Sequence, residues 1–66
     1  MGNHQAAEHH RKAAESYEES ASAHRLAAEA HERGDEEEAR RLCVEAVRMH
    51  EEGMRHEKEA LRSHSV

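Results

Sequence analysis

Histidine, cysteine, tyrosine and glutamate side chains recur every seven residues along this chain. Two such series flank Gly34 and Asp35, with the members Asn3, His10, Tyr17, His24 and His31, then Glu36, Cys43, His50, Glu57 and His64. If the chain folds back at Gly34, every member of the first series faces one of the second, because the numbers of each facing pair add up to 67. Imidazole, thiolate and carboxylate groups bind zinc, and the first two also suit copper and nickel.

The facing pair of His24 and Cys43 gives the sharpest metal prediction. In a dimer, two copies of this pair would supply two thiolates and two imidazoles, which is a common tetrahedral zinc set. His10, Glu57 and His50 are the next candidate ligands. The sequence thus predicts a site for Zn, Cu or Ni on the surface where the two halves meet.

A structural role is the alternative hypothesis for the same residues. A polar residue at one repeated position of packed helices often fixes register and oligomeric state. On this interpretation His24 and Cys43 only set register, and His10 forms a buried hydrogen bond with Glu57.

The remaining aromatic and imidazole groups allow similar alternatives. Tyr17 fills the middle of the contact surface on the structural hypothesis, with its hydroxyl proton accepted by His50. His9 and His56 have numbers that add up to 65, which predicts that they approach one another, and solvated helix faces are the alternative.

Two long helices must position these groups. Residues 3–33 lack Gly and Pro and are rich in Ala, the strongest helix former, so we expect a first helix there. Gly34 suits the left-handed position that ends a helix. Asp35 then caps a second helix over about 36–64, and Glu38 completes a capping box. The predicted fold class is all-α, a long antiparallel helical hairpin in one domain, 1–66, with Asn3 or a neighbour capping the first helix.

The heptad pattern predicts which faces meet. With the two polar series at position a, positions d and e of the first helix are small: Ala6, Ala7, Ala13, Ala14, Ser20, Ala21, Ala27 and Ala28. The same positions of the second helix are Ala39, Arg40, Ala46, Val47, Gly53, Met54, Ala60 and Leu61. Sustained heptads favour a left-handed supercoil, as in a coiled coil. We therefore expect a seam in which Ala-rich layers alternate with polar layers.

Gly53 lies inside the second helix, where glycine costs about 1 kcal/mol relative to Ala. One interpretation is close approach of another group, with Ala14 facing it. The other is a helix break after Glu52. The uninterrupted spacing of His50, Glu57 and His64 favours one continuous helix.

The size of the chain predicts self-association. A chain of 66 residues has a marginal core, and its single Cys cannot form an intrachain disulfide. A homodimer that forms a four-helix bundle would cover apolar side chains beside the seam, such as Leu42 and Val47. The alternative is a structural or protein-interaction module in which Leu26, Val44 and Met49 meet a partner helix.

Composition excludes several other functions. The net charge of −5 argues against nucleic-acid or anionic-membrane binding, and no segment is apolar enough to span a membrane. The lone thiol and the absence of a signal-peptide pattern predict a cytoplasmic protein. H-E-x-x-H, C-x-x-C, Glu-x-x-His and glycine-rich phosphate loops are all missing, so we expect no enzyme activity.

Three resemblances agree with the hairpin. The stretch from Ala30 through Gly34 and Asp35 to Ala39, with the later Ala46, resembles the turn of a tetratricopeptide repeat. Across its length, with Ala-Ala-Glu-His-His near the start, the chain resembles small uncharacterised bacterial Ala/His-rich helical-hairpin proteins. That resemblance implies architecture and no activity. In length and layout the chain is also similar to the Rop RNA-binding dimer, but no matching RNA-contacting residues carry over.

Overall fold

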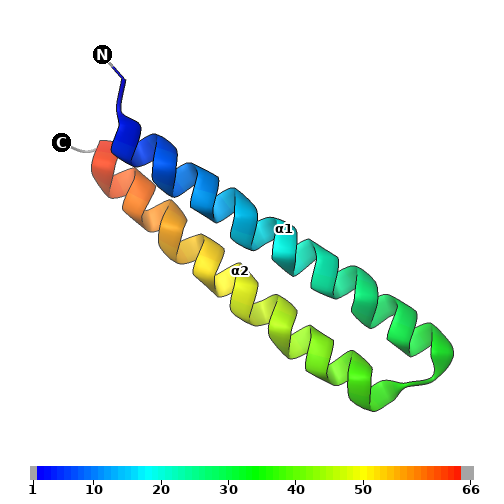
Figure 1. Ribbon diagram of the computed structural model, residues 1–66. Coiled ribbons are helices and arrows are strands. Elements are labelled where there is room, and N and C mark those ends of the chain that lie inside the picture. The colour runs from blue at the N-terminus through cyan, green and yellow to red at the C-terminus, as the bar shows by residue number, and fades with distance from the viewer. Residues whose placement is uncertain (1, 65–66) are drawn as a thin grey trace.

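The protein is a two-helix hairpin. A computed structural model describes residues 2–64, with the backbone alone for His64, so the predicted pairing of its side chain with Asn3 lies outside the described residues. Helix α1 spans His4–Arg33 and helix α2 spans Glu36–His64. The helices run antiparallel, and the start of α1 lies beside the end of α2 (Figure 1). The predicted hairpin and the continuity of α2 through Gly53 are confirmed.

Asn3 ties the open end of the hairpin together. Its side-chain oxygen accepts a hydrogen bond from the backbone nitrogen of Ala6 at 3.0 Å, which caps the first turn of α1. Its side-chain nitrogen donates to the backbone oxygen of Ser63 at 3.1 Å, across the gap to α2. One residue therefore satisfies an unpaired donor of α1 and an unpaired acceptor of α2.

The closed end is a glycine turn of the predicted kind. Gly34 has a φ of 81°, which is the left-handed conformation. Its nitrogen donates to the carbonyl of His31 at 3.0 Å, and the nitrogen of Asp35 donates to the carbonyl of Ala30 at 2.8 Å. This pair of bonds is a Schellman motif, which satisfies the last carbonyls of α1 and reverses the chain.

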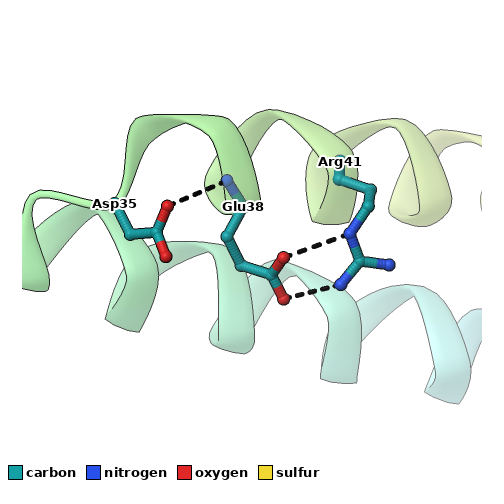
Figure 2. A network of polar contacts seen from close by, with 3 residues as sticks. All are labelled: Asp35, Glu38 and Arg41. Atoms are coloured by element: carbon teal, nitrogen blue, oxygen red, sulfur yellow. Dashed lines mark hydrogen bonds and ion pairs between the residues drawn. The ribbon is translucent and has the colours of Figure 1, made fainter.

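The capping box at the start of α2 forms only in part. Asp35 accepts a hydrogen bond from the backbone nitrogen of Glu38 at 3.2 Å, as predicted. The Glu38 carboxylate, however, binds the Arg41 guanidinium through two bonds of 3.1 and 2.6 Å (Figure 2). A bidentate bond to a guanidinium has a more favourable geometry than the return bond to the Asp35 nitrogen, which already donates to Ala30.

Small side chains form the seam between the helices. Positions d and g of α1 supply its buried residues, which are Ala6, Ala13, Ser16, Ser20, Ala23, Ala27 and Ala30. Position d of α2 supplies Ala39, Ala46, Gly53 and Ala60. The three alanines of this α2 set are 0% exposed. Ser20 Oγ donates to the carbonyl of Ala46 at 2.8 Å, so the backbone of α2 lies within reach of a serine on α1.

The predicted seam was wrong in its rotation. Position a of both helices and position e of α2, which hold larger side chains, border the seam instead of filling it. The predicted site residues His10, His24, Cys43, His50 and Glu57 are all exposed. Imidazole or carboxylate layers between the helices would hold the backbones apart, whereas Ala and Gly let them approach closely, and burying a charged carboxylate without a partner is costly. In the structure α1 is rotated so that its position g, and not a or e, joins position d in the seam, and the two backbones can come closer together.

The hairpin is elongated and exposes much of its surface. Its principal Cα extents are 52 × 14 × 9 Å, and its radius of gyration is 15.2 Å. A compact chain of this length would have a radius of gyration of about 11 Å. Neither of the two described helices has an apolar segment long enough to cross a membrane.

We predict that enlarging a seam alanine destabilises the hairpin. Ala46→Leu should lower the free energy of unfolding by about 1–3 kcal/mol, because the leucine has no space between the backbones. Chemical denaturation followed by circular dichroism measures this. Val44→Leu, at a position that is 55% exposed, is the control and should change stability by less than about 0.5 kcal/mol. Equal effects of both substitutions would contradict the observed seam.

Candidate functional site

The two polar series that were predicted to fill the seam lie together on one side of the hairpin. Because the helices are antiparallel and meet through their d positions, equal heptad positions of the two helices project to the same side of the hairpin. We call positions a and e of both helices the a/e face. Its described members on α1 and its cap are Asn3, Ala7, His10, Ala14, Tyr17, Ala21, His24, Ala28 and His31. Those on α2 are Glu36, Arg40, Cys43, Val47, His50, Met54, Glu57 and Leu61.

Contacts between the helices confirm two of the predicted pairs on this face. The Tyr17 and His50 rings lie 5.5 Å apart between centroids, with their planes inclined by 49°. At the turn, His31 Nδ1 lies 2.5 Å from a carboxylate oxygen of Glu36. Both pairs have the predicted pairing of residue numbers, yet they sit at the border of the seam, where longer side chains reach across.

Tyr17 occupies a notch that only glycine provides. A Cβ atom placed on Gly53 would lie 2.6 Å from Cε1 of the Tyr17 ring, far inside van der Waals contact. The tyrosine ring therefore packs on the bare backbone of α2. The predicted close approach at Gly53 is real, but its partner is Tyr17 rather than Ala14. This explains why a glycine stands inside an otherwise strong helix.

The Tyr17 hydroxyl donates to a carboxylate oxygen of Glu57 and not to His50, which corrects the predicted partner. This hydrogen bond, together with desolvation and the negative charge of Glu57, raises the pKa of Tyr17 above its ordinary value. The neutral phenol is thus favoured in the folded hairpin. Glu57 also lines an open hollow of about 570 Å³ with His10 and the side chains of Met54, Lys58 and Leu61.

His24 and Cys43 project from the same face but do not form a complete metal site within one chain. Among the described residues, no group of three or more His, Cys, Asp or Glu side chains is placed to hold a metal ion. The pair alone offers two donors, whereas structural zinc takes four. Metal binding by His24, Cys43, His10, Glu57 and His50 therefore stays a prediction that concerns an assembly of chains.

The a/e face is poor in charge and carries a row of exposed apolar side chains. Only three of its seventeen described members, Glu36, Arg40 and Glu57, carry a formal charge, although charged residues make up 38% of the chain. Val47, Met54 and Leu61 follow one another at seven-residue intervals and are 47%, 39% and 69% exposed. Depletion of charge with enrichment of Met and Tyr is typical of the core of a protein interface.

Sequence reasoning named Val47 as an apolar side chain for a dimer to cover, but it missed Met54 and Leu61 as surface residues because it assigned position e to the seam. A size argument would have found it. The d positions of α2 are all Ala or Gly, while its e positions are Arg, Val, Met and Leu. Two helices that close on Ala and Gly leave no room for Met or Leu in the same layer.

No family model, curated protein or solved structure matches this chain.

We predict that Gly53→Ala changes the sign of its effect with the residue at position 17. With Tyr17 present, the new methyl group displaces the ring, and stability should fall by about 1 kcal/mol as packing and a hydrogen bond are lost. In a Tyr17→Ala background the same substitution should raise stability by up to about 1 kcal/mol, since Ala is the better helix former. Urea denaturation of the four proteins gives the coupling, and equal effects in both backgrounds would contradict the notch.

The Tyr17–Glu57 contact predicts a pH effect. Because the folded pKa of Tyr17 is raised, its contribution to stability is present below the unfolded pKa of about 10 and is lost as pH rises through the folded value. Tyr17 is the only tyrosine, so ultraviolet absorbance reports its ionisation directly. We expect a titration midpoint above that of free tyrosine. Glu57→Gln should lower the midpoint, whereas the exposed Glu51→Gln should not.

Proposed function

We propose that this chain is a non-enzymatic assembly module whose a/e face binds a second copy of itself, giving a four-helix bundle. The observation that carries the proposal is the row of exposed Val47, Met54 and Leu61 on a face that has few charges. On α1 the same face carries alanines at position e, which leave space for side chains of an opposing hairpin. The larger side chains on α2 of one copy can therefore pack against the alanines on α1 of the other copy.

The surface area of the hairpin supports a second copy as the occupant. The accessible area is 5081 Å². A folded monomer of this mass is expected to expose about 4,200 Å², which is roughly 800 Å² less. A standard protein interface buries about 800 Å² on each partner. The excess area is thus what one such interface would cover.

The energetics point in the same direction. Complete burial of a Val, Leu or Met side chain contributes about 1.5–3 kcal/mol, and the three side chains of the row are about half exposed in the single hairpin. Their further burial would contribute a few kcal/mol to a chain whose internal seam consists of alanine, serine and glycine. An assembly of two hairpins would therefore be more stable than two separate ones.

In such a bundle the polar members of the a/e face would set register or complete a metal site. His24 and Cys43 contribute two donors from each hairpin, so a Cys₂His₂ zinc site needs both copies. Without metal, the same side chains would specify how the two hairpins align, since mismatched polar groups in an interface are costly.

Sedimentation equilibrium tests the proposed dimer. The wild-type chain should sediment at twice its mass of 7.5 kDa. Met54→Glu should weaken dimerisation by at least about 100-fold, because a buried unpaired carboxylate costs several kcal/mol. Val44→Glu is the matched control, since Val44 is an equally apolar, exposed residue outside the a/e face. A monomeric wild-type chain, or equal disruption by both variants, would contradict the proposal.

Native mass spectrometry with and without a chelator separates the two roles of the polar residues. A dimer that carries whole-number metal and dissociates on chelation would establish the shared site if the His24→Ala variant is both metal-free and monomeric. A metal-free dimer that is unaffected by the chelator would leave His24 and Cys43 with a role in register.

A further inference from the structure

The hollow on the a/e face lies toward the open end of the hairpin and is lined from both helices. His10 comes from α1, and Met54, Glu57, Lys58 and Leu61 come from α2. Its walls include the exposed apolar side chains of Met54 and Leu61. Because this hollow belongs to the face on which we have proposed a second copy, some part of that copy has to cover it.

On the opposite side of the hairpin, the edge of the seam is covered from within the chain. His9 of α1 and His56 of α2 are half-buried there, and their ring centroids lie 6.4 Å apart. The approach that their numbers predicted is confirmed. On the a/e side, by contrast, His10 and Glu57 are exposed, so another chain can reach the hollow.

The two helices carry side chains of opposite size at position e. This position holds Val47, Met54 and Leu61 on α2, whereas on α1 it holds only alanines, which are Ala7, Ala14, Ala21 and Ala28. Ser16 of α1 donates a hydrogen bond to Glu52 of α2 at 3.3 Å, which relates the heights of the two helices. Counting two residues from this pair toward the open end places Met54 and Ala14 at the same height on different helices.

Two-fold symmetry allows two ways to lay one a/e face on another. If the axis runs along the hairpin, the two turns lie at the same end, and α2 of each copy lies on α1 of the other. If the axis runs across the hairpin, the turns lie at opposite ends, α1 lies on α1, and α2 lies on α2. The two arrangements differ in what each large side chain meets.

The sizes of the side chains favour the first arrangement. With the turns at the same end, each large side chain of α2 meets an alanine of the second copy at its own height. With the turns at opposite ends, Met54 crowds Val47 of the second copy, while alanines face alanines and leave space. Overpacking and cavities both destabilise a packed contact. Only the first arrangement also brings both His24–Cys43 pairs to one height, as a metal site shared by two copies requires.

The first arrangement also gives Glu57 a polar partner. It places His10 of the second copy opposite the Glu57 carboxylate, which accepts the Tyr17 hydroxyl within its own chain. A carboxylate can accept several hydrogen bonds, so an imidazole N–H of the second copy can bind it as well. A second hydrogen bond reduces the cost of burying this charge in an interface.

We propose that residues 7–14 of the second copy cover the hollow, so that two hairpins pair with their turns at the same end. Ala7 and Ala14 of the second copy pack against Leu61 and Met54, and α2 of each hairpin lies on α1 of the other. This inference rests on the proposed dimer and adds its orientation and its pairs of contacting residues.

Exchanging the sizes of one contacting pair tests the orientation by sedimentation equilibrium. Ala14 is exposed in the single hairpin, so Ala14→Leu should leave the hairpin folded but weaken dimerisation by at least about 10-fold, because the leucine overlaps with Met54 of the second copy. Adding Met54→Ala should restore most of the affinity. Adding Val47→Ala instead is the control and should not restore it, since Val47 lies at another height. Undiminished dimerisation of Ala14→Leu, or equal rescue by both alanines, would overturn the orientation and leave the dimer itself in place.

The distance between the two turns gives an independent readout. Spin labels on Glu37→Cys in a Cys43→Ser chain report it by electron–electron double resonance, since Glu37 is exposed near the turn and outside the a/e face. Turns at the same end should give a distance below about 30 Å. Turns at opposite ends would give about 40 Å, because residue 37 lies thirteen residues from the middle of α2 and a helix rises 1.5 Å per residue. A distance near 40 Å would overturn the orientation, whereas a monomeric wild-type chain would remove the proposed dimer as well.

Discussion

The structure depends on the close approach of two helix backbones through alanine and glycine. Ala39, Ala46 and Ala60 are completely covered by α1, and Ser20 reaches the backbone of α2 with a hydrogen bond. Close contact of this kind gains many small dispersion contacts while burying few large side chains. This close contact also decides where the larger side chains lie, because any side chain larger than serine is placed at the edges of the seam.

Tyr17 is the exception that shows how strict this constraint is. A tyrosine ring enters the contact region only where α2 has no side chain, at Gly53. Glycine inside a helix is unfavourable, and the packing of the ring with its bond to Glu57 offsets that cost. The notch also fixes the relative position of the helices along their length, since the ring fits at one place. A seam made of alanines alone would not fix this position.

The seam divides the rest of the surface into two unlike sides. The a/e face has exposed Val47, Met54 and Leu61 with few charges, which is the basis for proposing a second copy there. The opposite side holds the His9–His56 pair. There α2 also carries glutamates at seven-residue intervals, among them Glu38, Glu45 and Glu59, each paired with the arginine three residues later. These ion pairs are largely solvent-exposed and contribute little individually, but they keep that side hydrated. The proposed assembly therefore uses the side of the hairpin that has few charges.

The sequence by itself determined the two helices, their ends and their antiparallel arrangement, because those features depend on local chemistry. An alanine-rich run without Gly or Pro forms a helix, Gly34 takes a left-handed conformation, and Asn3 and Asp35 cap the first turns of the two helices. The seven-residue spacing also predicted that Tyr17 meets His50 and that His31 meets Glu36.

The tertiary structure alone decided the rotation of each helix about its axis. Heptad positions a, d, e and g are neighbours on a helix, so the spacing alone permits several seams. The choice among them depends on how near the backbones can come, which is a property of both helices together. That choice placed His24 and Cys43 outside the seam and left Val47, Met54 and Leu61 uncovered.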